Sequence, residues 1–367
     1  MAAKKPATAA KRRATKSAGT ARAATVHPPA ILLMGPTASG KTGVAVELVR
    51  QLNCEIISVD SAQVYRDMNI GTAKPDADIL AAAPHHLIDL ISPDETYSAA
   101  RFRDDALTVM REITERGNIP LLVGGTMMYF KTLTEGLSEL PEADPLIRMI
   151  IDTMAEEKGW PGVHRELARV DPEIAAKLAP NDAQRIQRAL EVYYITDRTM
   201  SELQKKPKYV YFPYTPLKIA LLPSDRAVLH ERIADRFEGM LELGLISELR
   251  KLRKSYALEA TMPSMRCVGY RQAWDYLDEK ISLSQLREQG IAATRQLAKR
   301  QLTWVWAGCI ASNKLYVDAN NRLKTITESA AQALTMLDTE IAALKAEAPA
   351  DEAAAKVFDQ KAADAKA

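Results

Sequence analysis

The chain of 367 residues carries 49 lysines and arginines against 47 aspartates and glutamates, a formal net charge of +2. This balance excludes nucleic-acid binding through overall charge, so any such surface has to come from local clusters. Hydrophobic residues make up 47%, and no apolar run approaches the ~20 residues that cross a bilayer, so we expect a globular cytoplasmic protein with no membrane partner. Three cysteines without paired spacing exclude a disulfide framework and a structural zinc site.

The two ends of the chain differ from its middle. Residues 1–29 hold several basic side chains and no acidic one, and residues 341–367 are rich in alanine and charge. Neither stretch can bury an apolar core. We therefore expect both to be disordered tails, and an RNA-attracting arm or an organelle transit peptide is an alternative for the first.

Between the tails, short apolar runs alternate with amphipathic segments. Strands are expected at 31–34, 55–59, 86–90, 119–123 and 217–222, and helices at 42–52, 98–116 and 225–239. Strands that alternate with helices predict an α/β fold, a P-loop-like parallel sheet flanked by helices on both faces.

A long charged stretch with helical periodicity interrupts this alternation. It runs over 143–213 and contains turn signals at Gly159, Pro161 and Pro180. We interpret it as an inserted all-helical domain. The catalytic core is then formed by 30–142 together with 214–340.

The first predicted strand leads directly into a glycine-rich motif of the form G-x-x-x-x-G-K-T. Its members are Gly35, Pro36, Thr37, Ala38, Ser39, Gly40, Lys41 and Thr42. The glycines allow backbone N–H groups to surround an anion, and the helix that follows adds its N-terminal partial charge. Lys41 supplies a cation, and the Thr42 hydroxyl can bind Mg²⁺. The motif predicts a polyphosphate site.

Two further segments are expected at the same edge of the sheet, because they follow the strands 55–59 and 119–123. Asp60 could act as a base, as a metal-site carboxylate or as a turn cap. The Gly124-Gly125-Thr126 turn either lets the backbone approach a ligand or closes a tight turn. Spacing alone does not decide between these interpretations.

Several motifs in a fixed order identify a family that the chain resembles. Besides the glycine-rich loop they comprise 71–75 (GTAKP), 84–89 (PHHLID), 124–129 (GGTMMY), 181–189 (NDAQRIQRA), 266–271 (RCVGYR) and 293–301 (ATRQLAKRQ). Together they resemble the tRNA dimethylallyltransferase (tRNA isopentenyltransferase) family of the bacterial type. The resemblance covers residues 31 to about 306.

The resemblance implies transfer of a dimethylallyl group from dimethylallyl diphosphate to the N6 amine of the adenosine 3′ of the anticodon, position 37. It implies Mg²⁺ as cofactor at Thr42, a glycine-rich loop that holds the donor's diphosphate, and a tRNA anticodon stem-loop as partner. Asp60 would be the base that accepts the amine proton, Arg236 a second cationic contact to the diphosphate, and Thr126 a residue near the adenine. We expect a monomer.

The resemblance also implies tRNA contacts, many of them in basic segments. On the helix at 184–188, side chains three and four apart share one face, opposite Ile186, Leu190 and Tyr193. Basic and aromatic groups interleaved, as around 266–271 and 299–306, suit unpaired RNA bases, although Trp304 is an equally good core residue. Many relatives carry arginine where this chain has Trp306, so a cationic contact is lost there or replaced by stacking. The expected tRNA contacts are Asp60, Ser61, Ala62, Gln63, Thr126, Arg148, Gln184, Arg185, Ile186, Gln187, Arg188, Arg266, Cys267, Val268, Gly269, Tyr270, Arg271, Lys299, Arg300, Gln301, Leu302, Thr303, Trp304, Val305 and Trp306.

Three other functions fit parts of the sequence. A small-molecule kinase would use the glycine-rich loop for ATP and would need no tRNA. Prenyl transfer to free adenine nucleotides would share the chemistry but not the basic helices. A nucleotide-gated RNA-binding protein would form no covalent product and would not depend on Asp60.

Overall fold

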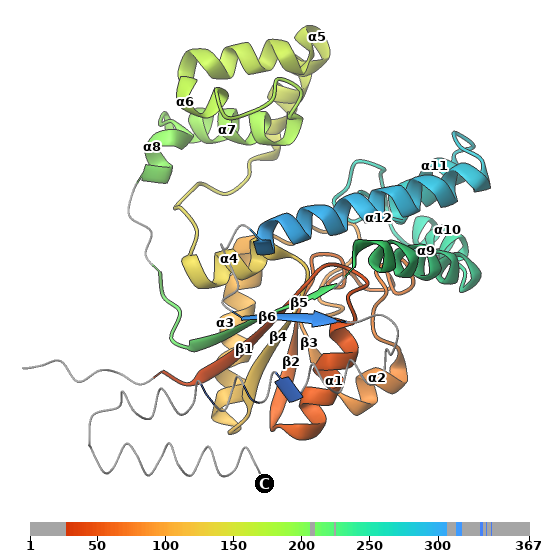
Figure 1. Ribbon diagram of the computed structural model, residues 1–367. Coiled ribbons are helices and arrows are strands. Elements are labelled where there is room, and N and C mark those ends of the chain that lie inside the picture. Colours follow the sequence, from red (N-terminus) through yellow and green to blue (C-terminus); the bar gives the residue numbers. More distant parts are fainter. Residues whose placement is uncertain are drawn as a thin grey trace, which may run out of the picture.

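A computed structural model describes residues 27–205, 210–223, 225–306 and 313–317, with isolated positions at 331, 332, 335 and 339. Within these residues, parallel strands form a six-stranded sheet in the order β3-β2-β4-β1-β5-β6 (Figure 1). The strands are β1 Pro29–Met34, β2 Cys54–Val59, β3 His85–His86, β4 Ile119–Gly124, β5 Thr215–Pro223 and β6 Asn313–Val317. The expected α/β fold with a parallel sheet is confirmed.

The central strands are buried on both faces because their side chains point alternately into two cores. Along β1, Leu32 and Met34 belong to one apolar cluster, and Ile31 and Leu33 belong to the other. Both faces of this strand therefore need apolar side chains, and the resulting continuous apolar run is the pattern that predicted the strand.

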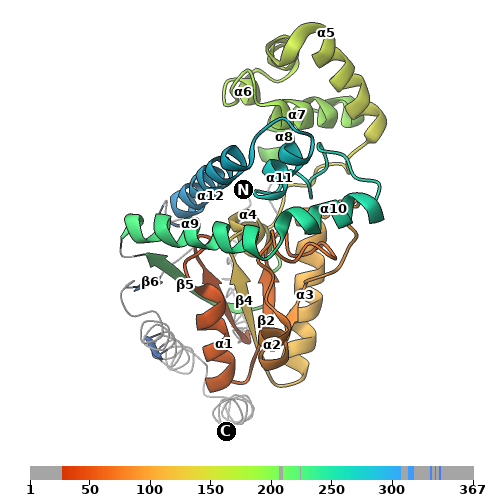
Figure 2. The ribbon, with the colours of Figure 1, turned by 90° about the vertical axis from the view of Figure 1, so that its right-hand side faces the viewer.

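Helices cover both faces of the sheet and its carboxyl edge. They are α1 Lys41–Gln51, α2 Ala77–Ala82, α3 Ala99–Glu115, α4 Met127–Glu135, α9 Arg226–Glu242, α10 Leu245–Ser255, α11 Tyr270–Leu277 and α12 Leu283–Trp306. The buried side chains of α1 belong to one core cluster, and those of α3 and α4 belong to the other. Figure 2 shows α9 and α10 lying across the ends of the strands, with α12 beyond them.

The predicted strand at 86–90 is wrong beyond its first residue. β3 ends at His86, because Leu87 and Asp89 adopt left-handed backbone angles, with φ of 61° and 54°. The Asp89 carboxylate instead lies 2.5 Å from the Lys74 ammonium. The remaining predicted elements are shifted by three residues or fewer at their ends.

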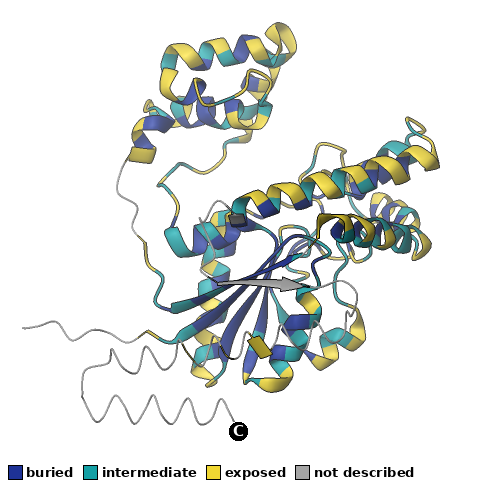
Figure 3. Ribbon diagram, viewed as in Figure 1, coloured by how far each residue is buried: buried dark blue, intermediate teal, exposed yellow. Residues whose placement is uncertain are grey.

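Helices α5 to α8 form a separate layer beyond α12 (Figures 1 and 3). They are α5 Pro145–Val170, interrupted at Gly159 (φ 66°), α6 Pro172–Ala175, α7 Ala183–Thr196 and α8 Met200–Lys205. Their buried side chains, among them Ile151 and Leu190, form a cluster of their own. All four lie within the stretch 143–213, for which an inserted domain stays a prediction.

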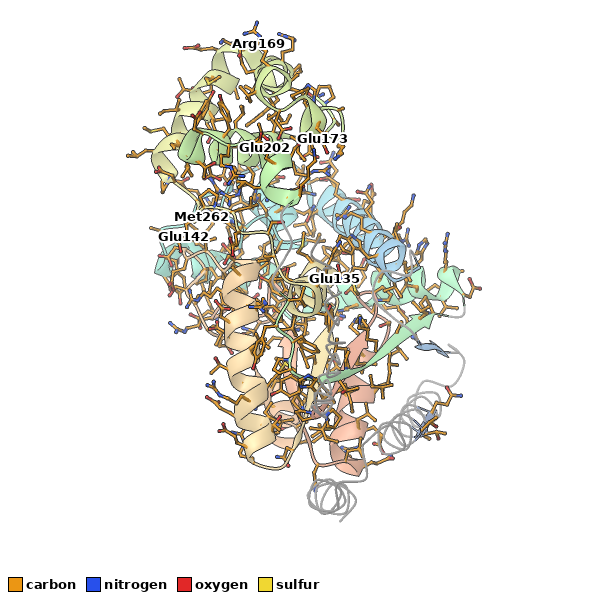
Figure 4. The ribbon with its side chains drawn as sticks, turned by 90° about the vertical axis from the view of Figure 1, so that its left-hand side faces the viewer. Glu135, Glu142, Arg169, Glu173, Glu202 and Met262 are labelled. Atoms are coloured by element: carbon orange, nitrogen blue, oxygen red, sulfur yellow. The ribbon has the colours of Figure 1, made fainter. Side chains whose placement is uncertain are left out.

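Figure 4 labels Glu142 in the segment that leads into this helical layer, and Arg169, Glu173 and Glu202 within it.

The expected disorder of 1–29 and 341–367 falls on residues that, apart from 27–29, lie outside the described part of the chain. No helix among the described residues is both long enough and apolar enough to cross a bilayer.

Glu55 joins four elements at the amino end of the sheet. Its carboxylate accepts hydrogen bonds from Arg116 at 2.7 and 2.9 Å and from Asn118 at 2.8 Å, and it lies 2.7 Å from His86 Nε2. The hydrogen bonds from Arg116, helped by those from Asn118 and His86, lower the pKa of Glu55 to about 2 although burial opposes the shift. The carboxylate thus stays ionised where β2, β3, α3 and β4 meet.

We expect Glu55→Gln to lower the free energy of unfolding at pH 7 by about 1–2 kcal/mol, because the group is partly solvated. The folded-state pKa is below the unfolded one, so the stabilisation is present above about pH 4.5 and is lost as the pH falls toward 2. Urea unfolding at pH 7 and pH 3 measures this. The exposed Glu157→Gln is the control, and an equal loss at both pH values would contradict the assignment.

Candidate active site

A cleft of about 1140 Å³ lies at the carboxyl edge of the sheet, between α9 and α12. Pockets for one small ligand usually measure about 300–1,000 Å³, so this cleft has room for more than one small molecule. Its wall brings together segments far apart in the sequence: 37–44, 58–63, 123–128, 232–240, 263–268 and 294–304, with Gln184 from α7. The structure therefore places the glycine-rich loop, Asp60, Thr126 and Arg236 in one cleft, as the sequence predicted.

The glycine-rich loop connects β1 to α1. Gly40 precedes the helix with φ of 91°, a conformation that favours glycine. At Gly35, an added Cβ would lie 2.5 Å from the carbonyl oxygen of Leu221. No side chain among the described residues caps α1, so its first N–H groups are available to an anion.

Lys41 is half-buried in the loop. Its Nζ donates to the carbonyl oxygen of Pro36 at 2.6 Å and lies 3.5 Å from Ser39 Oγ. Burial, with the positive charge of Arg236, lowers the pKa of Lys41 to about 7, and the Asp60 carboxylate opposes this shift. The cleft thus concentrates positive charge that a bound anion would stabilise.

Asp60 follows β2 and lies across from the loop. Its Oδ1 accepts a hydrogen bond from the backbone N–H of Ala62 at 2.8 Å, so the turn-cap role weighed from the sequence is real. Asp60 also lines the cleft, and its negative charge raises the pKa of Lys41. One side chain thus holds a turn and presents a carboxylate to the cleft.

The Gly124-Gly125-Thr126 turn packs directly on the end of β2. A Cβ on Gly124 would lie 2.0 Å from the carbonyl oxygen of Val59, which confirms the tight-turn alternative. The turn also lines the cleft, where approach of its backbone to a ligand stays a prediction. The Thr126 hydroxyl accepts a hydrogen bond from the Ser61 N–H at 3.1 Å. This contact places Thr126 beside the residue that follows Asp60.

Two other residues expected to contact tRNA lie next to Asp60. Ala62 and Gln63 both line the cleft. The Gln63 side chain is also a bridge, since Oε1 accepts from the Ser58 hydroxyl at 2.9 Å and Nε2 donates to the Ala73 carbonyl at 3.4 Å. Gln63 therefore fixes the loop that follows β2.

The segment 266–271 divides between surface and core. Arg266 and Arg271 are exposed, and Arg266, Cys267 and Val268 line the cleft. Burial raises the pKa of the Cys267 thiol to about 12. Tyr270 does not face solvent as interleaving with the arginines suggested. It is fully buried behind Gly269, and its hydroxyl donates to Glu248 at 2.5 Å.

Sequence reasoning missed Glu248. Besides the Tyr270 hydroxyl, its carboxylate accepts the backbone N–H groups of Asn69, Ile70 and Gly71 at 2.8–3.2 Å. It holds the loop that carries the GTAKP motif. These contacts, such as the one with Ile70 across 178 residues, reveal this role, and no local pattern signals it.

The end of α12 faces the cleft on one side and solvent on the other. Lys299, Arg300 and Thr303 are exposed, Leu302 and Val305 are buried, and α12 ends at Trp306. Trp304 packs partly against the core, as one interpretation predicted, and it also lines the cleft, where a contact with tRNA stays a prediction. The Lys131 ammonium lies 5.7 Å from the centre of its ring.

In the helical layer, Gln184 and Arg185 are exposed at the start of α7, and Ile186 is fully buried. Gln187 donates to Asp152 at 2.7 Å. Arg185 bonds Asp182, the residue that caps α7, and remains largely accessible. These exposed groups lie where the sequence predicted a polar face.

Arg148 and Arg188 differ from that picture. Both bind the fully buried Glu191, Arg148 through Nε at 2.8 Å and Arg188 through Nη1 at 2.5 Å. Although burial raises the pKa of Glu191, the two arginines lower it overall. Arg188 also donates to the Pro141 carbonyl at 2.6 Å. The basic face drawn from helical spacing is therefore not uniform, because Arg188 also holds the helical layer together.

Comparison with known proteins shows the family to which the chain belongs. Residues 63–307 match the family model described as IPP transferase. The chain belongs to this family. It is 61% identical to the tRNA dimethylallyltransferase of Nitrosospira multiformis over 279 residues, 76% of this chain and 86% of that protein. It is 58% identical to that of Thiobacillus denitrificans, over 80% and 95%.

Solved structures of the family share the fold. The full-length tRNA isopentenylpyrophosphate transferase of Bacillus halodurans is similar with a TM-score of 0.60 at 35% identity, over 85% of this chain and 97% of that one. A eukaryotic dimethylallyltransferase acting on tRNA gives a TM-score of 0.72 at 28% identity, over 86% and 80%.

A further feature that sequence reasoning did not locate is an apolar wall of the cleft. It is formed by Ile233, Phe237 and Met240 of α9 and Leu297 of α12. The spacing of four and seven residues along α9 was a usable signal, because such residues share one helix face. The spacing alone did not show that this face of α9 meets the cleft.

The different settings of Arg185 and Arg188 predict different effects of their loss. We expect Arg185→Ala to weaken binding of a tRNA anticodon stem-loop and to reduce the salt slope of log Kd by about 1, with unchanged thermal unfolding. Arg188→Ala should instead lower the free energy of unfolding by about 1–3 kcal/mol, because Glu191 loses a partner in a buried site. Fluorescence anisotropy over a salt series and thermal melts measure both, and identical behaviour of the two variants would contradict this division.

Proposed function

We propose that this chain transfers a dimethylallyl group from dimethylallyl diphosphate to the N6 amine of adenosine 37, 3′ of the anticodon in tRNA. The observation that carries the proposal is one cleft, in a member of this family, that combines an anion-binding loop, the Asp60 carboxylate and an apolar wall. The relatives named tRNA dimethylallyltransferase, with 58–61% identity, support the same activity.

The acceptor amine needs help because its lone pair is delocalised into the purine ring. In the proposed step the N6–C1 bond forms, the C1–oxygen bond to the diphosphate breaks, and the N6 proton passes to Asp60. The Thr126 hydroxyl accepts a hydrogen bond from the Ser61 N–H and so holds in place the residue that follows Asp60. The adenine has to leave the stack of the anticodon loop to reach them, at a cost of a few kcal/mol that contacts elsewhere in the RNA offset.

The leaving diphosphate carries concentrated negative charge. The N–H groups at the start of α1, the Lys41 ammonium and the guanidinium of Arg236 can stabilise it inside the cleft. Lys41 is poised for this role, since an arriving anion favours its protonated form. The apolar wall of Ile233, Phe237 and Met240 offers a surface for the prenyl chain.

The residues present fit Mg²⁺ as cofactor. Among the described residues no group of three or more acidic, histidine or cysteine side chains forms a metal site. Mg²⁺ at phosphate sites takes only one or two protein oxygens and is otherwise held by phosphate and water, which the exposed Thr42 hydroxyl suits. When bound there, the ion would neutralise charge on the leaving diphosphate.

The exposed cations Arg185, Arg266, Arg271, Lys299 and Arg300 suit the phosphates of a stem-loop. Since one chain supplies the glycine-rich loop, Asp60, Thr126 and Arg236 to the cleft, we propose that the enzyme acts as a monomer. An enzyme with tRNA as substrate would act in the cytoplasm, as expected from the sequence.

The proposal is tested by incubating the purified protein with dimethylallyl diphosphate, Mg²⁺ and unmodified tRNA. Nucleoside mass spectrometry should find N6-isopentenyladenosine at position 37 and nowhere else, and a tRNA with guanosine 37 should stay unmodified. Prenylated AMP formed in preference to tRNA, or phosphoryl transfer from ATP to a metabolite, would instead support the alternatives drawn from the sequence.

A further inference from the structure

Gln301 joins the two loops that form the floor of the cleft. From α12, its side-chain Oε1 accepts the backbone N–H of Thr37 in the glycine-rich loop at 2.9 Å. Its Nε2 donates to the carbonyl oxygen of Gly125 at 2.9 Å. One amide thus binds the turns that follow β1 and β4, which are adjacent strands of the sheet.

The site is built for an amide in one orientation. A backbone N–H can only donate and a carbonyl oxygen can only accept, so the two partners fix which end of the Gln301 amide faces which loop. Gly125 leaves the necessary space, because a Cβ there would lie 2.5 Å from Gln301 Nε2. Any side chain at position 125 would therefore displace this bridge.

Gln301 also occupies a particular place on α12. The preceding Lys299 and Arg300 are exposed, and Trp304, one turn further, lines the cleft. A polyanion that binds the exposed basic side of this helix therefore acts on the same rigid element that reaches the phosphate loop. Of the expected tRNA contacts on α12, Gln301 has its whole amide engaged by protein backbone.

We propose that Gln301 is a positioning residue that couples tRNA binding on α12 to the geometry of the phosphate-binding loop, so that tRNA and the diphosphate donor raise each other's affinity. The inference rests on the proposed function. Two hydrogen bonds to two loops give α12 a direct mechanical connection to Thr37. Since coupling between two sites is reciprocal, the effect has to be the same factor in both directions.

The coupling is measured as the ratio of donor affinities with and without RNA. The probes are dimethylallyl S-thiolodiphosphate, a donor analogue that does not react, and an anticodon stem-loop with adenosine 37, in magnesium buffer. We expect the stem-loop to tighten analogue binding to the native chain about 5- to 30-fold, with the reciprocal effect of the analogue on the stem-loop. Gln301→Met, which keeps the length but not the polar groups, should abolish the ratio in both directions.

Two further variants make the test specific. Gln296→Met changes an exposed glutamine on the same helix and should retain the native ratio. Gly125→Ala breaks the bridge from its other side and should lose the ratio as Gln301→Met does, which gives an independent result where one variant unfolds. Thermal melts identify such a loss of folding.

The inference is overturned if Gln301→Met and Gly125→Ala retain the native ratio, or if the native chain binds both ligands without coupling. It is also overturned if Gln301→Met weakens analogue binding by one factor regardless of RNA, because a merely structural role predicts that result. These outcomes leave the proposed function intact when the native chain still prenylates tRNA. Absence of prenyl transfer by the native chain counts against the proposed function itself.

Discussion

Asp60→Asn is expected to lower the rate of prenyl transfer about 10²- to 10⁴-fold, the usual contribution of a positioned general base. Asparagine retains an oxygen that can accept the Ala62 N–H, so the turn after β2 stays in place. What disappears is the proton acceptor for the adenine amine. Single-turnover rates with saturating donor and tRNA measure the effect on chemistry alone.

The Asp60→Asn experiment needs a control for the loss of the negative charge. The carboxylate raises the pKa of Lys41, so its removal leaves more of Lys41 neutral and weakens donor binding at alkaline pH. Rates should therefore be compared near pH 6.5 and with donor in large excess. A native rate from Asp60→Asn under these conditions would mean that another group accepts the proton.

Lys41→Met should lower kcat/KM for the donor about 10²- to 10³-fold, which corresponds to about 3–4 kcal/mol of lost transition-state stabilisation. The ammonium is the cation that the loop itself supplies, and the Asp60 carboxylate favours its protonated form. The affinity for the stem-loop without donor should not change. Initial rates over a donor series and stem-loop anisotropy separate the two quantities.

Two variants frame the Lys41 result. Lys41→Arg keeps the positive charge and should recover part of the rate, although a guanidinium does not reproduce the geometry of an ammonium. Lys251→Met alters an exposed lysine on α10 and should behave as the native enzyme. Loss of tRNA affinity in Lys41→Met as large as its loss in kcat/KM would contradict a role confined to the donor.

The layered core was predictable because its signals are local. The buried runs of β1, β2 and β4 and the G-x-x-x-x-G-K-T motif fix where strands end and which backbone groups face the cleft. The predicted strand at 86–90 ends early because Leu87 and Asp89 adopt left-handed angles, and the N–H groups of Asp89 and Leu90 donate to carbonyl oxygens of the segment after β2. Sequence periodicity contains no information on such contacts.

The candidate site also has features that local motifs predicted and features that depend on distant contacts. Asp60, Thr126 and Arg236 could be placed from the motifs of a resembling family, and the cleft brings them together. The roles of Arg188 and Gln301 could not be predicted, because their partners lie on other elements. Glu191 forms ion pairs with both Arg148 and Arg188, and Gln301 pairs with a residue 264 positions away. Helical spacing gives the direction of a side chain but not its partner.

The central claim is that the glycine-rich loop holds an allylic diphosphate as a leaving group while Asp60 accepts the proton of the adenine amine. The most direct measurement is a single turnover with donor labelled by ¹⁴C in the prenyl group and by ³²P in the diphosphate. We predict that ¹⁴C appears on adenosine 37 and that ³²P is released as pyrophosphate in equal amount. Transfer of ³²P to RNA, or pyrophosphate release without ¹⁴C on the tRNA, would contradict the account.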